Sequence, residues 1–339
     1  MLNPIPFRLL GALALILPGT ACFSPLVSPL PEGGSTDTGG SSTTPSADEG
    51  STTVELPGTD GSTTTDSGSS TGGPPEPECG PEDENPCPEA QYCVAGACAD
   101  PPEGMVAVPA GSAWMGCNES IDNQCSDDEH PFHEVLIDAF AIDRTEVTVA
   151  DYMACVDEGE CSSPDGTDAF GEPCTLGESP EHPMTCVDWF AASAYCEHLG
   201  KRLPTEAEWE KAARGDSGQL YPWGDTNPSC NEAVMEECPV SGTQPVGSKP
   251  AGASPYGALD MGGNVFEWVA DWYAAAYYVE SPLENPTGPA TGTRRVTRSA
   301  GPNYGDAAMR ASSRGVDFEV PTPDDASVAI GFRCVFIPE

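Results

Sequence analysis

The alternation of apolar and polar residues predicts β-strands at the start of the C-terminal two thirds of the chain. The segments MVAVPAGSAWMG at 105–116 and HEVLIDAFAIDRTEVT at 133–148 place apolar side chains at nearly every second position. A period of two residues is typical of a half-buried strand. We therefore predict short strands within both segments.

Three later segments are predicted to form helices, because each begins at a residue that caps helices well. Thr148 precedes a helix through Tyr152 to Val156, Asp188 precedes the segment WFAASAYCEHL, and Thr205 precedes EAEWEKAAR. In the third helix Glu208 completes a capping box with Thr205. Gly200 and Gly215 are expected to end the second and third helices.

The region after Gly215 contains mostly Gly, Pro, Asn and Asp between short aromatic stretches. Such residues favour turns over helices and strands. All six Trp lie in the segment 104–339, whose length is typical of one globular domain. We predict an α+β domain with little regular secondary structure, held together by turns, aromatic side chains and crosslinks.

The N-terminus has the pattern of an export signal. One cation, Arg8, precedes an apolar run from Leu9 to Leu17, and small residues stand before Cys22. The run is too short to span a bilayer in the mature protein. We predict a lipoprotein signal peptide over 1–22, with Cys22 lipidated as the new N-terminus. Gly19 stands where a larger aliphatic residue is usual, so ordinary signal cleavage nearby stays open as the alternative.

Two small segments separate the signal peptide from the domain. The segment 23–78 contains no Lys or Arg and, beyond Phe23, no aromatic residue, so it is predicted to be a disordered linker. The segment 79–103 has a single aromatic residue, Tyr92, and four cysteines, Cys79, Cys87, Cys93 and Cys98. It is predicted to rely on two disulfides, and a stapled spacer is favoured over an independent binding module.

Charge and cysteine content limit the partners and the compartment. Thirteen Lys and Arg against 54 Asp and Glu give a net charge of −41, which excludes nucleic acids and anionic membrane surfaces as partners. Of the 15 cysteines, setting aside Cys22 leaves an even number, and none stands in a Cys-x-x-Cys pair. In an exported chain this composition predicts disulfides rather than a zinc site.

Several blocks between 104 and 335 together resemble the formylglycine-generating enzyme family, also called sulfatase-modifying factor domains. They are MVAVPAGSAWMG, DRTEVT, HPMTCVDWFAASAYC, GKRLPTEAEWEKAARG, YPWGD, TQPVGS, YGALDMGGNVFEW and GFRC. The resemblance rests on the number and order of these blocks. It implies an irregular, disulfide-rich α+β fold related to C-type lectins and stabilised by calcium.

The block DMGGNVFEW resembles the calcium loop of that family. The resemblance implies the side chain of Asp260, the carbonyls of Gly263 and Val265 and the carboxylate of Glu267 as ligands. Oxygen ligands suit a hard cation, and a glycine-rich turn lets carbonyls converge. The alternative is a tight turn in which Glu267 only forms a salt bridge. A second calcium site is implied to begin at Asn231, where the following loop is short.

The resemblance also implies one disulfide, between Cys196 and Cys334. The second disulfide of the family is absent, because Ala213 and Ala311 occupy its positions. Local pairs are expected at Cys117 with Cys125 and at Cys230 with Cys238. The connectivity of Cys155, Cys161, Cys174 and Cys186 stays open.

The chain lacks the residues that carry the family's oxidase chemistry. Family oxidases bind Cu(I) through two thiolates before GFRC and convert a substrate cysteine into formylglycine. Residues 298–333 contain no cysteine, and Met309 alone is a poor copper ligand, so copper is not expected. Arg310 and Arg314 match a family arginine pattern, and we expect structural ion pairs rather than substrate binding from them.

Two functions from different classes follow. The first is an exported, lipid-anchored binding or scaffold domain in the cell envelope, at the outer membrane or surface of a bacterium. It would contact the membrane only through its lipid and bind an envelope protein, a peptide or a glycan. The alternative is an oxidase of protein cysteine that uses an unrecognised metal site. The absence of the cysteine pair favours the first.

Overall fold

The computed structural model describes residues 91–94, 96–164, 179–315 and 321–338, together with Cys79 and Cys87. The predicted signal peptide with Cys22 and the predicted linker lie outside the described residues. Within the described part, no helix has both the length and the apolar character that a membrane crossing requires.

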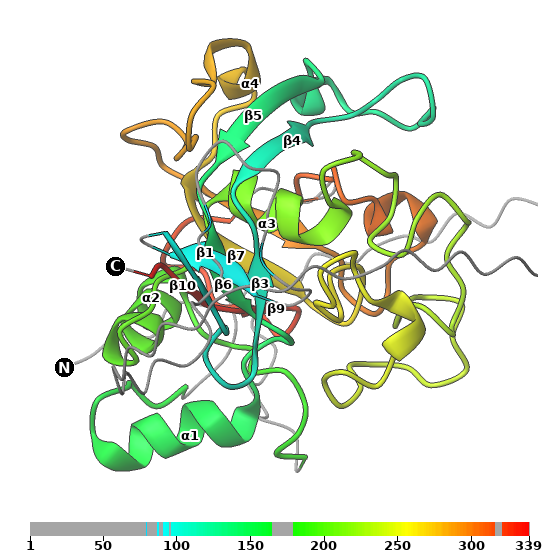
Figure 1. Ribbon diagram of the computed structural model, residues 1–339. Helices are drawn as coiled ribbons and strands as arrows, with labels where there is room; N and C mark the ends of the chain where they lie inside the picture. The colour runs from blue at the N-terminus through cyan, green and yellow to red at the C-terminus, as the bar shows by residue number, and fades with distance from the viewer. Residues whose placement is uncertain are drawn as a thin grey trace, which may run out of the picture. The chain divides into compact units, whose positions relative to one another are not determined.

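The strands predicted from the alternating pattern are present. They are β3 (Met105–Val108), β4 (Gly111–Met115), β5 (His133–Ile137) and β6 (Phe140–Asp143). β3 pairs antiparallel with β6, and β4 pairs antiparallel with β5 (Figure 1). β10 (Val335–Phe336) pairs with the other edge of β6, so the end of the chain closes this sheet.

The three predicted helices begin at the predicted caps. They are α1 (Val149–Glu158), α2 (Trp189–His198) and α3 (Glu206–Arg214), with a short α4 (Tyr277–Glu280) and three 3₁₀ turns, η1 (Asp127–Glu129), η2 (Pro250–Gly252) and η3 (Asp306–Met309). The side chains of Thr148, Asp188 and Thr205 each accept a backbone N–H of the first turn. Glu208 completes the capping box of α3, which fixes the start of a helix whose three glutamates are all buried.

A second three-stranded sheet positions Glu267 and Arg298. It contains β7 (Phe266–Trp272), β8 (Arg295–Ser299) and β9 (Ile330–Phe332), with β7 in the middle. β7 runs antiparallel to β8 and parallel to β9, so that Glu267 stands opposite Arg298 on one side and Gly331 on the other. The Gly-rich loop before β7 and the segment after β8 therefore lie at the same end of this sheet, and the block GFRC begins in β9 beside Glu267.

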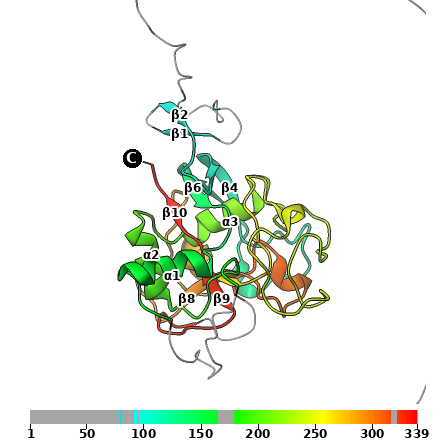
Figure 2. The same ribbon diagram turned by 90° about the horizontal axis from the view of Figure 1, so that it is seen from below.

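Two buried clusters flank the sheets. One is built around Trp268 with residues of α1 and α2, and the other around Trp209 of α3 with residues of β4, β5 and β6. Both tryptophan side chains are fully buried. Figure 2 shows α1 and α2 on one side of the molecule and the irregular segment between α3 and β7 on the other. The low regular content expected after Gly215 is confirmed, since residues 215–265 contain only η2 among the described helices and strands.

Disulfides connect distant and neighbouring parts of the chain. Cys196 of α2 is bonded to Cys334, 138 positions later, as the family resemblance implies. The expected local pairs Cys117–Cys125 and Cys230–Cys238 are present, the open pairing of Cys155 is resolved as Cys155–Cys161, and Cys186 is also disulfide-bonded.

The four-cysteine segment 79–103 has the two disulfides that were predicted, and in addition it packs against the domain through Tyr92. Its two disulfides are Cys79–Cys93 and Cys87–Cys98, and its strands are β1 (Tyr92–Val94) and β2 (Ala97–Ala99). Tyr92 is only 2% exposed, because it packs against Met105, Ala107 and Ala141 of the domain. The segment therefore shares a hydrophobic cluster with β3 and β6.

Candidate functional site

The described segment after β8, residues 300–315, is held in place by buried ion pairs. Arg310 is almost fully buried, and its Nη1 lies 2.6 Å from Glu129 and 2.8 Å from Asp122. A second bond of 2.8 Å joins Nη2 of Arg310 to Glu129, which makes the pair bidentate. The expectation that Arg310 serves a structural ion pair is confirmed.

Arg314 is engaged in the same way by α3. Its Nε and Nη2 donate to Glu206 at 2.7 and 3.0 Å, and Glu206 also accepts bonds of 3.0 Å from Arg298 and from the hydroxyl of Tyr278. Burial would raise the pKa of Glu206, but the guanidinium groups of Arg314 and Arg298 outweigh burial and hold the pKa below its usual value. One carboxylate therefore accepts hydrogen bonds from two buried cations.

Helix α3 supplies further acids to this network. Glu210, one turn after Glu206, pairs with Arg298 at 3.0 Å and with Arg214 at 2.8 Å. Asp271 of β7 accepts the backbone N–H of Glu206 at 2.8 Å, and burial followed by the Glu206 charge raises the pKa of Asp271 well above its usual value. The sequence predicted only a helix at these residues. The i, i+4 spacing of Glu206 and Glu210 was the one sign that this helix presents two acids on the same face.

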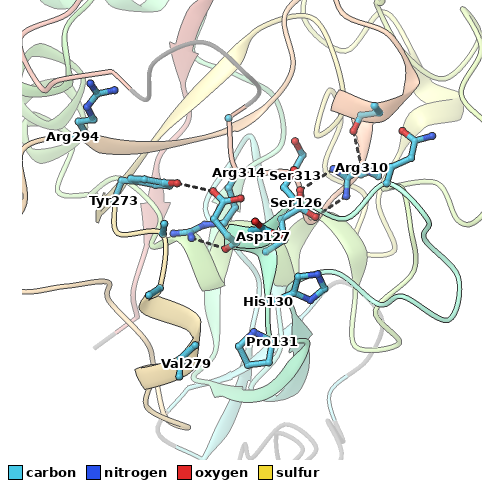
Figure 3. A pocket seen from close by; sticks show the side chains of 17 residues that line it. Ser126, Asp127, His130, Pro131, Tyr273, Val279, Arg294, Arg310, Ser313 and Arg314 are labelled. Carbon is cyan, nitrogen blue, oxygen red and sulfur yellow. Dashed lines mark hydrogen bonds and ion pairs between the residues drawn. The ribbon is translucent and has the colours of Figure 1, made fainter.

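An open pocket of about 1390 Å³ lies over this network. Figure 3 shows Arg314 on the side of Tyr273 and Arg310 on the other side, with Ser313 and Ser126 between the two arginines. The hydroxyl of Tyr273 donates to Asp128 at 2.8 Å, and burial, then this bond, raises the pKa of Tyr273 to about 12. The pocket has apolar walls and carboxylates, and the guanidinium groups of Arg310 and Arg314 that line it donate to Glu129 and Glu206 of the protein itself.

The described sulfur atoms near this segment are either buried or disulfide-bonded. Met309 is fully buried in the cluster around Trp268. All thirteen cysteines that the structure describes are disulfide-bonded. Among the described residues, two groups of Cys, Asp, Glu or His lie close enough to hold a metal, Cys79 with Cys87 and Cys98, and Cys117 with Asp122 and Cys125. Their sulfurs are bonded to other sulfurs, so they are not free thiolates.

The predicted calcium loop has the compact shape that the sequence suggested. A Cβ on Gly263 would lie 2.6 Å from the carbonyl oxygen of Val234, so only glycine fits there. Oδ2 of Asp260 accepts the backbone N–H of Gly247 at 2.5 Å, and Val265 is fully buried. The Gly-rich turn therefore brings the expected ligands Asp260, Gly263 and Val265 into one buried loop.

Glu267 makes the salt bridge that was left open as the alternative. Its two oxygens accept bonds of 2.6 and 2.7 Å from Arg333, and the indole N–H of Trp209 adds a third at 2.8 Å. All three side chains are fully buried. Asn231, the expected start of the second calcium site, is exposed and donates its backbone N–H to Ser229. The assignment of Glu267 and Asn231 to calcium stays a prediction.

Glu146 also belongs to this cluster, and sequence reasoning missed it. It is 2% exposed, and its Oε1 accepts a 3.1 Å bond from the side chain of Asn264, inside the calcium loop. Its Oε2 is buried without a hydrogen-bond partner. Burial, and then the carboxylate of Asp260, raise the pKa of Glu146 well above its usual value. An unsatisfied buried carboxylate oxygen beside further acids fits a site for a hard cation.

Comparisons with known proteins agree with this geometry. Residues 91–337 match the model of the sulfatase-modifying factor enzyme 1-like domain. The chain is 32% identical over 290 residues to the formylglycine-generating enzyme of Streptomyces coelicolor, which covers 68% of this chain and 88% of that relative. It is 31% identical over 298 residues to the mouse protein named inactive C-alpha-formylglycine-generating enzyme 2, which covers 73% of this chain and 89% of that relative.

Solved structures give the same result for the fold. PvdO from Pseudomonas aeruginosa superposes with a TM-score of 0.59 at 29% identity, over 68% of this chain and 93% of its own. Variable protein 1 of Treponema denticola superposes with a TM-score of 0.54 at 24% identity, over 73% of this chain and 98% of its own. The predicted irregular α+β fold is confirmed.

Proposed function

Because the chain belongs to the formylglycine-generating enzyme family, we propose that it is an exported, lipid-anchored member that serves as a calcium-stabilised binding or scaffold domain instead of a copper oxidase. The observation that supports this proposal most strongly concerns sulfur. Residues 298–333 contain no cysteine, and Met309, the sulfur residue of the described segment after β8, is fully buried. A Cu(I) centre with two thiolates has no ligands there.

The ion pairs of Arg310 and Arg314 support the same proposal. Arg310 and Arg314 are bound to Glu129 and Glu206, so their charges stabilise the fold. A relative named as inactive shares 31% identity with the chain, which shows that the family includes proteins named for the absence of the activity.

The pocket beside α4 is the candidate binding surface for an envelope protein, a peptide or a glycan. Its apolar wall includes Val279 and the ring of Tyr273, and its polar residues include Asp127 and Asp128. The net charge of −41 disfavours a nucleic acid partner. The alternative oxidase would need thiolates, and the described cysteines would supply them only after reduction of a disulfide such as Cys117–Cys125 beside Asp122.

Metal analysis of the purified full-length chain tests this proposal. We expect calcium and no stoichiometric copper or iron after the protein is incubated with equal amounts of the three metals under air. Stoichiometric copper or iron would contradict the proposal and favour the oxidase.

Calcium removal is expected to lower the melting temperature of the wild-type chain. A ligand that binds only the folded state stabilises it by about 2.7 kcal/mol when its concentration is a hundred times Kd. Asp260→Ala should abolish this dependence, because it removes a carboxylate from the loop. Differential scanning calorimetry with calcium or with a chelator measures the shift. Identical curves in both buffers would remove calcium from the proposal.

The lipid anchor gives a separate prediction. Cys22→Ser should move the protein from the membrane fraction to the soluble fraction, since a membrane anchor of this kind depends on acyl chains at the N-terminus. Cell fractionation followed by immunoblotting measures the distribution, with Ser24→Ala as a matched control that should stay with the membrane. A wild-type chain that is already soluble would contradict lipidation.

A further inference from the structure

We propose that the free edge of β4 is a docking site for an extended, basic peptide segment of a partner protein, which adds to the β4–β5 sheet as a further strand. The inference goes beyond the proposed function, because it names a second surface and a partner class that depend neither on calcium nor on the pocket beside α4. None of the residues of β4 lines that pocket.

The position of β4 in its sheet leaves one edge free. Figure 1 shows β5 between β4 and the segment around α4. On the side of that segment, the N–H of Leu136 donates to the carbonyl of Leu283, and the carbonyl of Leu136 accepts the N–H of Asn285. Leu136 therefore directs both backbone groups away from β4. Ser112 stands opposite Leu136, so it directs its own N–H and carbonyl away from β5.

Trp114, two residues further along β4, has the same orientation as Ser112. The backbone groups of these two residues have no hydrogen-bond partner among the described residues. Buried backbone groups in proteins are nearly all paired, which indicates that these four groups face water. Both residues are exposed, and Trp114 is 39% exposed. The edge therefore offers two donors and two acceptors at the spacing of a strand.

The free part of the edge lies between backbone groups that are already bonded. The N–H of Gly116 donates to Glu210 at 2.8 Å, and the carbonyl of Gly116 accepts a 2.7 Å bond from Arg214. At the other end, Lys211 donates to the carbonyl of Gly111 at 3.1 Å. These three side chains of α3 are buried. The edge is thus held in its extended shape before a partner binds, which lowers the entropy cost of binding.

The sequence of β4 lacks the features that protect edge strands from pairing with other chains. Protected edges carry charged residues, Pro or a bulge. β4 reads Gly-Ser-Ala-Trp-Met, and its pairing with β5 is continuous over all five residues. An unprotected edge of this kind is the surface to which extended peptides add as a strand.

The outer face of the sheet beside this edge favours a basic partner. Glu134 stands opposite Trp114, and Glu284 stands beside Leu136. Both glutamates are exposed, and neither forms an ion pair with a described residue. β4 and β5 contain no Lys or Arg. A residue of the added strand opposite Trp114 lies on the same face as the indole, so a Lys or Arg there can stack on the ring and approach Glu134.

A second copy of this chain is the less suitable occupant of the edge. Pairing two copies through β4 would bring two acidic faces together, and each chain carries a net charge of −41. A basic segment forms the same backbone hydrogen bonds with the opposite charge. Charge complementarity therefore favours a basic partner over self-association.

Amide hydrogen exchange of the full-length chain, resolved by residue, tests the inference. The probe is the synthetic peptide acetyl-Lys-Val-Lys-Val-Lys-Val-Lys-amide, which has all its cations on one face of a strand. At saturating probe, we expect the amide hydrogens of Ser112 and Trp114 to exchange at least about tenfold more slowly, because they donate to the added strand. The matched peptide with Glu in place of each Lys should leave both rates unchanged.

Two variants separate the backbone from the charge. Ser112→Pro removes an outward N–H that β5 does not use, and we expect the Kd of the Lys peptide in fluorescence anisotropy to rise at least about tenfold. Ser112→Ala keeps this N–H and should stay within about twofold of the wild type. Glu134→Lys leaves the backbone unchanged and should also weaken binding at least about tenfold. Glu160→Lys, the same charge change at an exposed position after α1, is its control.

Each outcome decides for or against the inference. Bound probe with unchanged exchange at Ser112 and Trp114 would place the peptide elsewhere, and equal binding of the Lys and Glu peptides would contradict the role of charge. A wild-type dimer that Ser112→Pro dissociates in analytical ultracentrifugation would assign the edge to a second copy instead. If Ser112→Pro does not fold, the exchange rates and Glu134→Lys still give the answer.

The proposed function and this inference can fail separately. A wild-type chain that does not bind the Lys peptide at concentrations up to about 1 mM would overturn the inference, since weaker binding gives no stable complex. Calcium uptake without copper or iron would then still support the proposed function.

Discussion

Replacing Glu206 with alanine is expected to lower the free energy of unfolding by about 3–5 kcal/mol. Glu206 is fully buried and accepts hydrogen bonds from Arg298 and Arg314. Its removal leaves Arg314 without the carboxylate bonded to its Nε and Nη2, takes one of two carboxylates from Arg298, and deprives the Tyr278 hydroxyl of its acceptor. Urea denaturation followed by circular dichroism measures the loss.

The matched control for this variant is Glu280→Ala on α4, which is exposed and should change the unfolding free energy by less than about 0.5 kcal/mol. A loss below about 1 kcal/mol for Glu206→Ala would mean that the buried ion pairs contribute little. The described segment after β8 would then need another source of stability.

Removing the Cys196–Cys334 disulfide is expected to have a comparably large effect. In the chain-entropy model, a loop of 138 residues gives a stabilisation of about 5 kcal/mol, less any native strain. The variant carries serine at both positions, which avoids leaving a free thiol. Guanidinium denaturation of the oxidised wild type and of the variant measures the difference.

The Cys155–Cys161 disulfide provides the control, because its cysteines are only 6 positions apart. The same model gives about 2 kcal/mol for so short a loop. The double serine variant at 155 and 161 should therefore be destabilised less than the variant at 196 and 334. Equal losses would show that loop length does not set the contribution of these crosslinks.

Local features of the fold were predictable from the sequence, because neighbouring residues determine them. The capping box of Thr205 and Glu208 needs only the spacing of two residues, and the alternation in β5 needs only one strand. The disulfide between Cys196 and Cys334 followed from the family resemblance, which supplied the long-range information that spacing lacks.

The partners of the buried acids could not be predicted from the sequence, because the ion pairs and hydrogen bonds join positions that are far apart in the chain. Nothing near Glu206 indicates that it faces Arg298 and Arg314, about a hundred residues later. Glu146 has the appearance of an ordinary polar residue in a strand-like block, and only the folded chain brings it to Asn264. Tyr92 likewise gave no sign that the four-cysteine segment would share a cluster with β3.

The segment after β8 shows how the family fold can persist without the copper ligands. Arg310 reaches Glu129 and Asp122, and Arg314 reaches Glu206, so the segment is anchored to η1 and α3 by side chains that need no thiolate. The architecture of this segment is therefore held without a cysteine pair. The proposed function is based on the absence of that pair from residues 298–333.

The most direct test of that claim is a turnover measurement. The calcium-loaded full-length protein is incubated with Cu(I), oxygen, a thiol reductant and a peptide that carries the sulfatase motif Cys-x-Pro-x-Arg, and the peptide mass is followed over time. The formylglycine-generating enzyme of Streptomyces coelicolor, a relative at 32% identity, serves as the positive control. We expect the peptide to keep its cysteine with this protein, and catalytic conversion of the cysteine to the aldehyde would contradict the account.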